Sequence, residues 1–410
     1  MTRPVSTRGR AMPPSPIRNL MPFAEEAKSR GVRVLHLNIG QPDLETPAPM
    51  REALSKIDRR TLAYTPSQGT DEYLDSILSD YRRIGIELAR DEILATAGGS
   101  EALIFAMMAC ADPGDEVLLV EPFYANYRSF ATMAGLHVKA LTARGRDGFH
   151  LPPLHLWEAS VTPRTRFVLL CNPNNPTGVV YTADEMQMVA DFCTRHDLFL
   201  ISDEVYRDFV YDGVEAISAL TLEDLEDRVI TVDSLSKRFS ACGIRLGWLA
   251  TRNRGLYSAM MRMAQGRLSA PGLAQLIAPA VATLGDEYFR KVRSEYQRRR
   301  DLLYDGLTSI DGVFLERPEG AFYFVVRLPI DDSQDFARWL LTDFEHHGST
   351  VMVAPATGFY ASNHLGRNEV RVAYVLNTED LTLAIEILAR AIPRYQEIRG
   401  EELAAAGMVP

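Results

Sequence analysis

Short apolar runs alternate with amphipathic stretches along most of the chain. Six of the runs have the length and composition of buried strands: 92–97, 116–120, 137–141, 166–171, 198–202 and 228–232. Amphipathic segments at 100–111 and 182–196 fall between such runs and have the apolar spacing of helices. Strands separated by helical crossovers are typical of a mainly parallel sheet with helices on both faces. The pattern therefore predicts an α/β fold.

The two ends of the chain predict a second, smaller unit of mixed α+β type. Near the N-terminus, 17–31 has the spacing of a helix, and 33–47 reads as a short strand leading into a Gly/Pro loop. A long helical stretch at 273–308 is expected to bridge the two parts. Further strands are expected in 312–328 and 369–376, and further helices in 333–347 and 378–392.

At 410 residues the chain is too long for one simple core, so two domains are expected. We expect residues 1–18 to form an N-terminal arm, residues 49–294 the large domain, and residues 19–48 together with 295–410 the small domain. The first 20 residues carry four arginines and four prolines. An organelle transit peptide would share the arginine bias, but prolines oppose its amphipathic helix. A mobile or partner-clasping arm is therefore favoured.

Composition narrows the function classes. The formal net charge is -10 and no long basic run follows the N-terminus, so nucleic acid is not an expected partner. The longest apolar stretch, 103–111, is far shorter than the roughly 20 residues that span a bilayer, so no membrane segment is expected. Four cysteines without CxxC spacing suit a reducing compartment such as the cytoplasm. The eight histidines form no metal-binding pattern, so no metal is expected.

Candidate chemistry follows the predicted strands, because ligands of open parallel sheets bind beyond the carboxyl ends of strands. In "ATAGGSEAL", Gly98 and Gly99 allow close backbone approach, and the N–H groups near Ser100 and Glu101 open a helix that favours an anion. A plain glycine turn capped by Ser100 is the alternative. Because no Gly-Lys-Ser/Thr follows, a nucleoside-triphosphate loop is not supported.

Two further motifs end strands with polar side chains. "CNPNNPTG" (171–178) is a rigid turn that could aim one asparagine into a cleft, or be a turn only. In "ISDEVYRDF", Asp203 and Val205 should share one side while Glu204 takes the other. A carboxylate at 203 could pair with a cationic ring nitrogen, or cap the next helix.

The fourth motif, "SLSKRFSACGIRLGW", starts at Ser234. Ser234, Ser236 and Arg245 are donors suited to a phosphate, and Lys237 lies between them. A lysine in such an interior stretch is costly unless it is paired or deprotonated; a phosphate-binding or a solvated lysine are the alternatives. For Arg238 the sequence suggests only a solvated or interface charge. A phosphate, a ring with a protonatable nitrogen and an electrophile together describe pyridoxal 5'-phosphate.

The chain resembles the fold type I aminotransferases of class I/II, and among them the bacterial aspartate aminotransferases. The resemblance covers about residues 16–395 and implies their fold, with a pyridoxal phosphate-binding large domain and a smaller domain. Seven motifs occur in the order of the family: "IGQPDLETP", "YTPSQGTDEY", "GGSEAL", "NPNNPTG", "SDEVY", "SLSKRFSACGIRLGW" and "EVRVAYV".

The resemblance implies a catalytic role for three residues. Lys237 matches the lysine that bonds to the cofactor and moves the substrate's α-proton. Asp203 is implied to keep the ring nitrogen protonated, which makes the ring an electron sink. Tyr206 and Asn175 are implied to bind the ring's 3-oxygen, and Tyr124 and Val205 are implied to cover the two ring faces.

The resemblance also implies a phosphate site and a dimer. The phosphate is implied to be bound by Ser234, Arg245 and further donors of Gly99, Ser100, Glu101 and Ser236. Tyr64 matches a tyrosine that reaches the phosphate of the neighbouring subunit's cofactor. The implied assembly is therefore a homodimer with shared active sites.

The implied reaction moves an amino group between an L-amino acid and a 2-oxo acid, with 2-oxoglutarate as the expected acceptor and ping-pong kinetics. Arg371 is implied to bind the α-carboxylate, with Gly40 and Asn175 completing that site. Some relatives read the donor's side-chain carboxylate with a lysine where this chain has Ser100. Arg267 is a candidate replacement from the partner subunit, and aromatic, aliphatic or sulfur-containing donors stay open.

Two other functions stay in view on the same residues. A carbon–sulfur lyase would use the same lysine, acid and arginine, and would release pyruvate and ammonia without an amino acceptor. A non-enzymatic regulator built on this fold would add a DNA-binding domain, for which the roughly 20 residues before the first helix leave no room.

Overall fold

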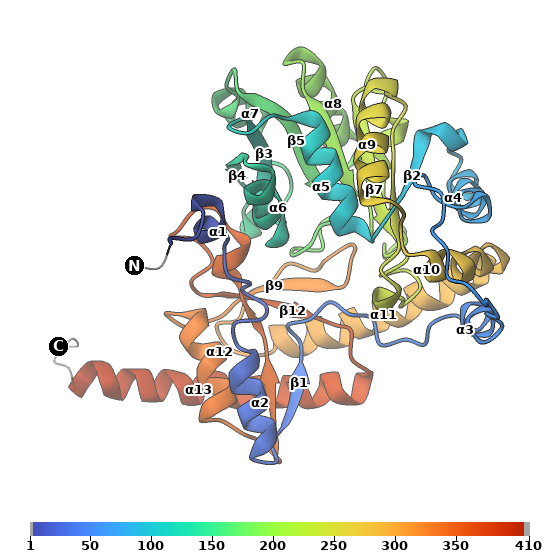
Figure 1. The fold of residues 1–410 in the computed structure, drawn as a ribbon. Coiled ribbons are helices and arrows are strands. Elements are labelled where there is room, and N and C mark those ends of the chain that lie inside the picture. The colour runs from blue at the N-terminus through green and yellow to red at the C-terminus, as the bar shows by residue number, and fades with distance from the viewer. Residues whose placement is uncertain (1–2, 406–410) are drawn as a thin grey trace.

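The computed structural model describes residues 3–405. Residues 1–2 of the predicted arm and 406–410 of the predicted small domain lie outside the described residues. Figure 1 shows a larger part built on one broad sheet and a smaller part in which blue N-terminal segments lie together with orange and red C-terminal segments. The first residues of the described chain lie beside the larger part instead. The predicted α/β class is confirmed.

The large sheet has seven strands in the order β2-β8-β7-β6-β5-β3-β4. Its strands are β2 (Ile93–Thr96), β3 (Glu116–Glu121), β4 (His137–Thr142), β5 (Thr165–Cys171), β6 (Phe199–Asp203), β7 (Val229–Ser234) and β8 (Gly247–Ala250). All six predicted runs form strands here. Every pairing is parallel except those of β8, which runs antiparallel to both β2 and β7. β8 was not among the predicted strands.

Two hydrophobic cores lie on the two faces of this sheet. On β5, Phe167 and Leu169 belong to one core while Val168 and Leu170 belong to the other, because successive side chains of a strand point to opposite faces. Both faces are buried, which explains why the strands read as continuous apolar runs.

Helices cover both cores. The first core includes residues of α5 (Gly99–Cys110), α6 (Asn126–Ala134) and α9 (Arg254–Arg267). The second includes residues of α4 (Asp71–Arg83), α7 (Leu154–Ser160) and α8 (Ala183–Arg195). α4 and α8 begin with threonine caps, Thr70 and Thr182, whose hydroxyls accept backbone N–H bonds.

The smaller part joins segments from both ends of the chain. β1 (Arg33–His36) pairs in parallel with β10 (Ser349–Met352), and β12 (Glu369–Ala373) pairs antiparallel with β11 (Ala354–Pro355) and β9 (Tyr323–Arg327). The remaining helices of the described chain are α1 (Thr7–Ala11), α2 (Met21–Ser29), α3 (Ala48–Ser55), α10 (Gly272–Ile277), α11 (Asp286–Thr308), α12 (Ser333–Thr342) and α13 (Thr378–Ala405). The pairing of β1 with β10 joins an N-terminal and a C-terminal segment, as expected for a small domain made from both ends of the chain. The exact domain boundaries stay predictions.

The expectation of one long helix over 273–308 is wrong. The helix α10 ends at Ile277, a 3-10 turn covers Ala278–Thr283, and α11 starts only at Asp286. Pro279 near the start of this turn has no N–H to continue an α-helix, and Gly285 is extended with φ -87 and ψ 177. The predicted strand region 312–328 is likewise interrupted around Pro318: it forms the strand β9 and two isolated bridges, Phe314 with Arg327 and Gly320 with Val210.

Truncation of the central strand should destabilise the whole large part. Ile201 on β6 has no exposed surface. Ile201→Ala is expected to lower the free energy of unfolding by about 2–5 kcal/mol, because it removes buried methyl groups and leaves a cavity. Denaturant unfolding followed by circular dichroism measures the change. The control is Leu54→Ala on α3, where the side chain is 58% exposed and the change should be within about 0.5 kcal/mol. Equal shifts for both variants would contradict the assigned core.

Candidate active site

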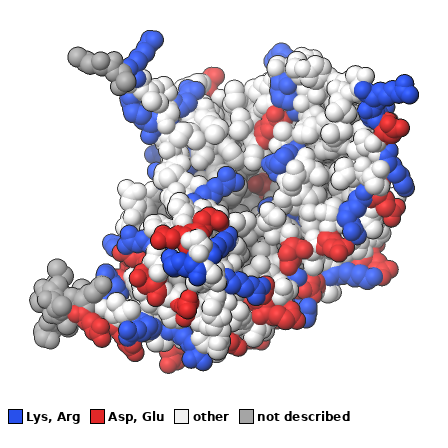
Figure 2. Space-filling model, turned by 60° about the horizontal axis from the view of Figure 1, so that its bottom comes forward, with Lys and Arg blue, Asp and Glu red and all other residues white. Residues whose placement is uncertain are grey.

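A cavity of about 660 Å³ opens beyond the carboxyl ends of β5, β6 and β7, where the two parts of the protein meet. Figure 2 shows a hollow near the middle of one face, with Lys and Arg side chains around it. Thirteen of the predicted site residues line the cavity: Gly40, Gly99, Ser100, Tyr124, Asn175, Asp203, Val205, Tyr206, Ser234, Ser236, Lys237, Arg245 and Arg371. The fold thus brings together residues as far apart along the chain as Gly40 and Arg371.

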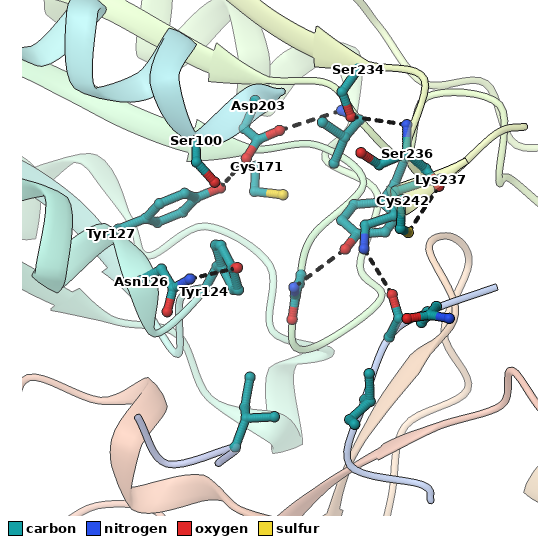
Figure 3. A pocket seen from close by; sticks show the side chains of 18 of the residues that line it. Ser100, Tyr124, Asn126, Tyr127, Cys171, Asp203, Ser234, Ser236, Lys237 and Cys242 are labelled. Carbon is teal, nitrogen blue, oxygen red and sulfur yellow. Dashed lines mark hydrogen bonds between the residues drawn. The ribbon is translucent and has the colours of Figure 1, made fainter. Parts of the chain in front are cut away.

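Lys237 follows the end of β7 and points into the cavity, where its Nζ donates to the backbone oxygen of Gly40 at 2.7 Å (Figure 3). Burial lowers the pKa of Lys237, and the charges of Arg371 and Arg245 add to this, whereas Cys242 and Asp203 act in the opposite direction. A lowered pKa favours the neutral amine, which is the nucleophilic form.

Asp203 ends β6 and is buried beside the cavity. Burial raises its pKa to about 6, although Tyr127 donates its hydroxyl to Oδ2 at 2.7 Å and thereby favours the carboxylate (Figure 3). Val205 also lines the cavity, while Glu204 turns away and accepts from Ser218 Oγ and Ala219 N at 3.0 and 2.8 Å. Asp203 and Val205 thus face the cavity while Glu204 faces the other side, as the sequence predicts. A cation placed near Asp203 would be paired with the one acid that lines the cavity among residues 3–405.

An anion cradle lies where α5 begins. The N–H groups of the first turn have no partner within the helix, so they favour a negative group. Gly98 has φ +78, and a Cβ there would lie 2.6 Å from Nη2 of Arg245, so the guanidinium lies directly over this turn. Ser234 and Ser236 line the same cavity. These donors are of the kind that a phosphate requires.

Arg371 on β12 is only 1% exposed. Its Nη1 donates to Oδ1 of Asn175 at 3.1 Å and its Nη2 to the backbone oxygen of Asn38 at 2.5 Å, but its Nε has no partner. Burial lowers the pKa of Arg371, and no carboxylate among the described residues pairs with it. A buried cation that faces a cavity without a counter-charge is a fit for a carboxylate ligand.

Tyr124, Tyr206 and Tyr323 also line the cavity. Tyr206 and Tyr323 share a hydrogen bond of 2.8 Å between their hydroxyls, and Nδ2 of Asn175 donates to Tyr206 at 3.4 Å. A Cβ on Gly40 would lie 1.7 Å from the Tyr323 hydroxyl, so only glycine fits there. Tyr124 accepts from Nδ2 of Asn126 at 2.8 Å (Figure 3).

Three predicted site residues do not line the cavity. Glu101 accepts from the backbone N–H of Ala97 at 2.8 Å and pairs with Arg267 at 2.8 Å. Arg267 also donates to the backbone oxygens of Ser67 and Ala95, so its guanidinium is satisfied within its own chain and the expected role as a substrate reader has no support here. Tyr64 is 79% exposed on the surface, and its contact with a partner subunit stays a prediction.

The expectation that Arg238 is a solvated or interface charge is wrong. Its side chain is 1% exposed and pairs with Asp233, with Asp80 at 2.6 Å and with Asp208 at 3.2 Å. Two of its three partners are distant along the chain: the fold supplies Asp80 from α4 and Asp208 from the segment after β6.

Several lining residues carry no signal in the sequence. Tyr127 lies in the "EPFYANY" segment but gave no reason to be singled out next to Tyr124, and Cys171 and Cys242 have no catalytic spacing. The N-terminal segment contributes Ser15, Ile17 and Arg18 to the cavity. A segment so distant along the chain can be placed at the site only by the fold.

Within residues 3–405, no group of three or more His, Cys, Asp or Glu is arranged to hold a metal ion. In the same described part, no helix is both long enough and apolar enough to cross a membrane.

A lysine with a lowered pKa, a buried carboxylate, an anion cradle and an unpaired buried arginine meet in one cavity. Such a set of groups suits an anionic ligand held beside an amine. Residues 32–388 match the family model for class I and II aminotransferases, and the chain belongs to that family. It is therefore a transaminase.

Known relatives agree with this class. Aspartate aminotransferase of Rhizobium meliloti is 33% identical over 90% of this chain and 92% of its own length. A mutant aspartate aminotransferase of Thermus thermophilus has a structure that superposes with a TM-score of 0.86, at 31% identity, over 95% of this chain and 100% of its own. Alanine aminotransferase of Pyrococcus furiosus gives 0.86 at 28% identity over the same shares. None of these three supports the carbon–sulfur lyase.

The hydroxyl of Tyr127 should control the proton affinity of Asp203. In the cofactor-free protein the carboxyl should be ionised above about pH 6 and protonated below it. Tyr127→Phe removes a bond to the ionised form, so the pKa of Asp203 should rise further. Infrared difference spectroscopy against Asp203→Asn isolates the carboxyl band. Tyr124→Phe is the control, since that hydroxyl binds Asn126 instead; an unchanged pKa in Tyr127→Phe would refute the assignment.

Proposed function

We propose that this transaminase binds pyridoxal 5'-phosphate in the cavity and moves an amino group between an L-amino acid and a 2-oxo acid. The observation that supports this most is that Lys237, Asp203 and the Arg245 cradle face one cavity of about 660 Å³. When bound, the cofactor supplies an electrophilic carbon and a pyridinium ring that withdraws electrons from the substrate's α-carbon. Each of these groups has a matching residue in the cavity.

The cofactor's groups meet residues on different strand ends. Asp203 would hold the proton of the ring nitrogen, and that cation would in turn hold Asp203 in its ionised form, since the opposite charge lowers the pKa that burial has raised. Arg245, Ser234, Ser236 and the first turn of α5 would hold the phosphate. Tyr206 and Asn175 would bind the ring oxygen, with Tyr124 and Val205 against the ring faces.

Lys237 and Arg371 would carry the reaction on the substrate. Arg371 would bind the α-carboxylate through its fork of N–H donors, which orients the α-carbon. Lys237 Nζ would take the proton from that α-carbon, since the lowered pKa of Lys237 favours the neutral amine. Ping-pong kinetics follow if the donor product leaves before the acceptor binds. We expect 2-oxoglutarate as an acceptor; relatives named for aspartate and for alanine leave the donor open.

We also propose a homodimer with shared sites. Five exposed apolar side chains lie on two neighbouring segments: Leu62, Tyr64, Leu268, Leu273 and Leu276. The segments are joined by a bond from Ser67 Oγ to the oxygen of Leu268 at 2.6 Å. Exposed apolar patches of this kind are typical of protein interfaces, and Tyr64 on this patch is the residue expected to reach the partner's site. The reducing cytoplasm is the expected compartment, since all four cysteines are free.

Loss of the Lys237 amine should abolish turnover. Lys237→Ala is expected to show no detectable transamination and no visible absorption of a covalently bound cofactor, because no other lysine lines the cavity. Stopped assays with a panel of amino acids and 2-oxoglutarate measure transamination, and an absorption spectrum measures the bound cofactor. Lys291→Ala, in an exposed position on α11, is the control and should match the unmodified enzyme. An active Lys237→Ala protein would exclude the proposed role.

A charge on the apolar patch should dissociate the dimer. Leu273→Asp, at a position that is 47% exposed in the single chain, should shift the protein toward a monomer, because burying an unpaired carboxylate in an interface is costly. Sedimentation velocity measures the shift. Leu156→Asp on α7 has a similar exposure of 40% and should leave the assembly unchanged. A monomeric unmodified enzyme, or a dimer that persists in Leu273→Asp, would contradict the proposed interface.

A further inference from the structure

The charges that line the catalytic cavity do not balance. Four cations line it, Arg18, Lys237, Arg245 and Arg371, against the single acid Asp203. The proposed function gives a partner to three of these cations: the cofactor to Lys237, its phosphate to Arg245 and the substrate's α-carboxylate to Arg371. Arg18 is left over, and it belongs to the N-terminal segment, outside the motifs that carry the cofactor chemistry.

Arg18 has no partner for its guanidinium among the described residues. Other arginines near the cavity are bonded: Arg245 donates to the oxygen of Cys242 at 2.8 Å, and Arg267 pairs with Glu101. Arg18 forms hydrogen bonds with described residues only through its backbone. Its N–H donates to the oxygen of Ser15 at 3.2 Å, and its oxygen accepts from the N–H of Met21 at 3.0 Å. Arg18 is exposed and lines the cavity, so its five side-chain N–H donors can bind a ligand there without breaking a bond to another described residue.

The backbone that carries Arg18 is fixed relative to Arg371. Nδ2 of Asn38 donates to the oxygen of Ile17 at 3.1 Å, and the oxygen of the same asparagine accepts from Arg371 at 2.5 Å. Pro16 packs so closely on Gly358 that a Cβ there would lie 2.4 Å away. One asparagine thus ties the residue before Arg18 to the arginine that receives the α-carboxylate.

Arg18 and Arg371 also act on the same hydroxyl. Burial raises the pKa of Tyr124, and the positive charges of Arg371 and Arg18 both lower it. Arg18, Tyr124 and Arg371 all line the same cavity. Two cations that line one cavity suit a ligand with two carboxylates.

We propose that Arg18 binds the second carboxylate of a dicarboxylic amino acid or 2-oxo acid whose first carboxylate is bound by Arg371. This inference rests on the proposed function, because it needs Arg371 as the α-carboxylate site. It replaces Arg267, whose guanidinium is occupied, as the reader of the substrate's side chain. The substrate class is then the C4 and C5 dicarboxylates, such as aspartate, glutamate and 2-oxoglutarate.

Equilibrium binding tests the charge pairing without turnover. Succinate and glutarate are inert dicarboxylates, and butyrate is a monocarboxylate of similar length. In the cofactor-loaded enzyme, Arg18→Gln should weaken binding of at least one of the two dicarboxylates about tenfold, since one charge-assisted contact is lost. Butyrate binding should stay within about twofold, and calorimetry measures both. Arg10→Gln, on the same segment but outside the cavity, is the control and should change neither.

Kinetics separate this inference from the proposed function. With 2-oxoglutarate as acceptor, Arg18→Gln should lower kcat/KM about tenfold, mainly through KM; with pyruvate it should change little, and Arg18→Lys should recover part of the loss because it keeps the charge. Equal losses with both acceptors, or no loss with either, would overturn the role of Arg18 while leaving the transaminase intact. An unmodified enzyme without turnover on any donor would instead contradict the proposed function.

Discussion

A buried ion cluster at the end of β7 fixes the geometry on which the site depends. Asp233 has no exposed surface and pairs with Arg238, which also pairs with Asp80 at 2.6 Å. Arg207 pairs with the same Asp80 at 2.7 Å. Asp233, Arg238 and Arg207 are at most 5% exposed and Asp80 is 14% exposed, so removal of one partner leaves a largely buried ion uncompensated and costs about 3–5 kcal/mol. The cluster ties α4, the segment after β6 and the turn after β7 into one position.

Lys237 directly precedes Arg238 in the chain. The ion cluster therefore fixes the backbone from which the Lys237 side chain enters the cavity. Asp203 and Glu204 lie at the end of the neighbouring strand β6, where successive side chains point to opposite faces. The carboxylate of Asp203 therefore faces the cavity and that of Glu204 faces the core. Arg371 reaches the same cavity from β12 of the smaller part. Among the described residues that line the cavity, cations outnumber acids four to one, and such an excess favours anionic ligands.

The sequence was sufficient for the features that rest on local spacing and on ordered motifs. The strands of the large sheet were predictable because both of their faces are buried, and Asp203 and Val205 because a strand alternates. Arg238, the Glu101–Arg267 pair and Arg18 were not, since their partners or neighbours come from segments far away along the chain. The break within 273–308 was missed for another reason: Pro279 and Gly285 interrupt a stretch whose apolar spacing stays helical on both sides. Ion pairs between residues that are far apart in the chain produce no periodic pattern in the sequence.

The central claim is that Lys237 alone bonds to the cofactor. Borohydride reduction of the cofactor-loaded enzyme, followed by peptide mass spectrometry, tests it most directly, because reduction fixes the label on the attached lysine. The chain offers its own controls in the exposed Lys28, Lys56, Lys139 and Lys291. The phosphopyridoxyl label is predicted on the peptide that contains Lys237 and on none of the other four. A label on another lysine, or no label in a protein that retains activity, would contradict the account.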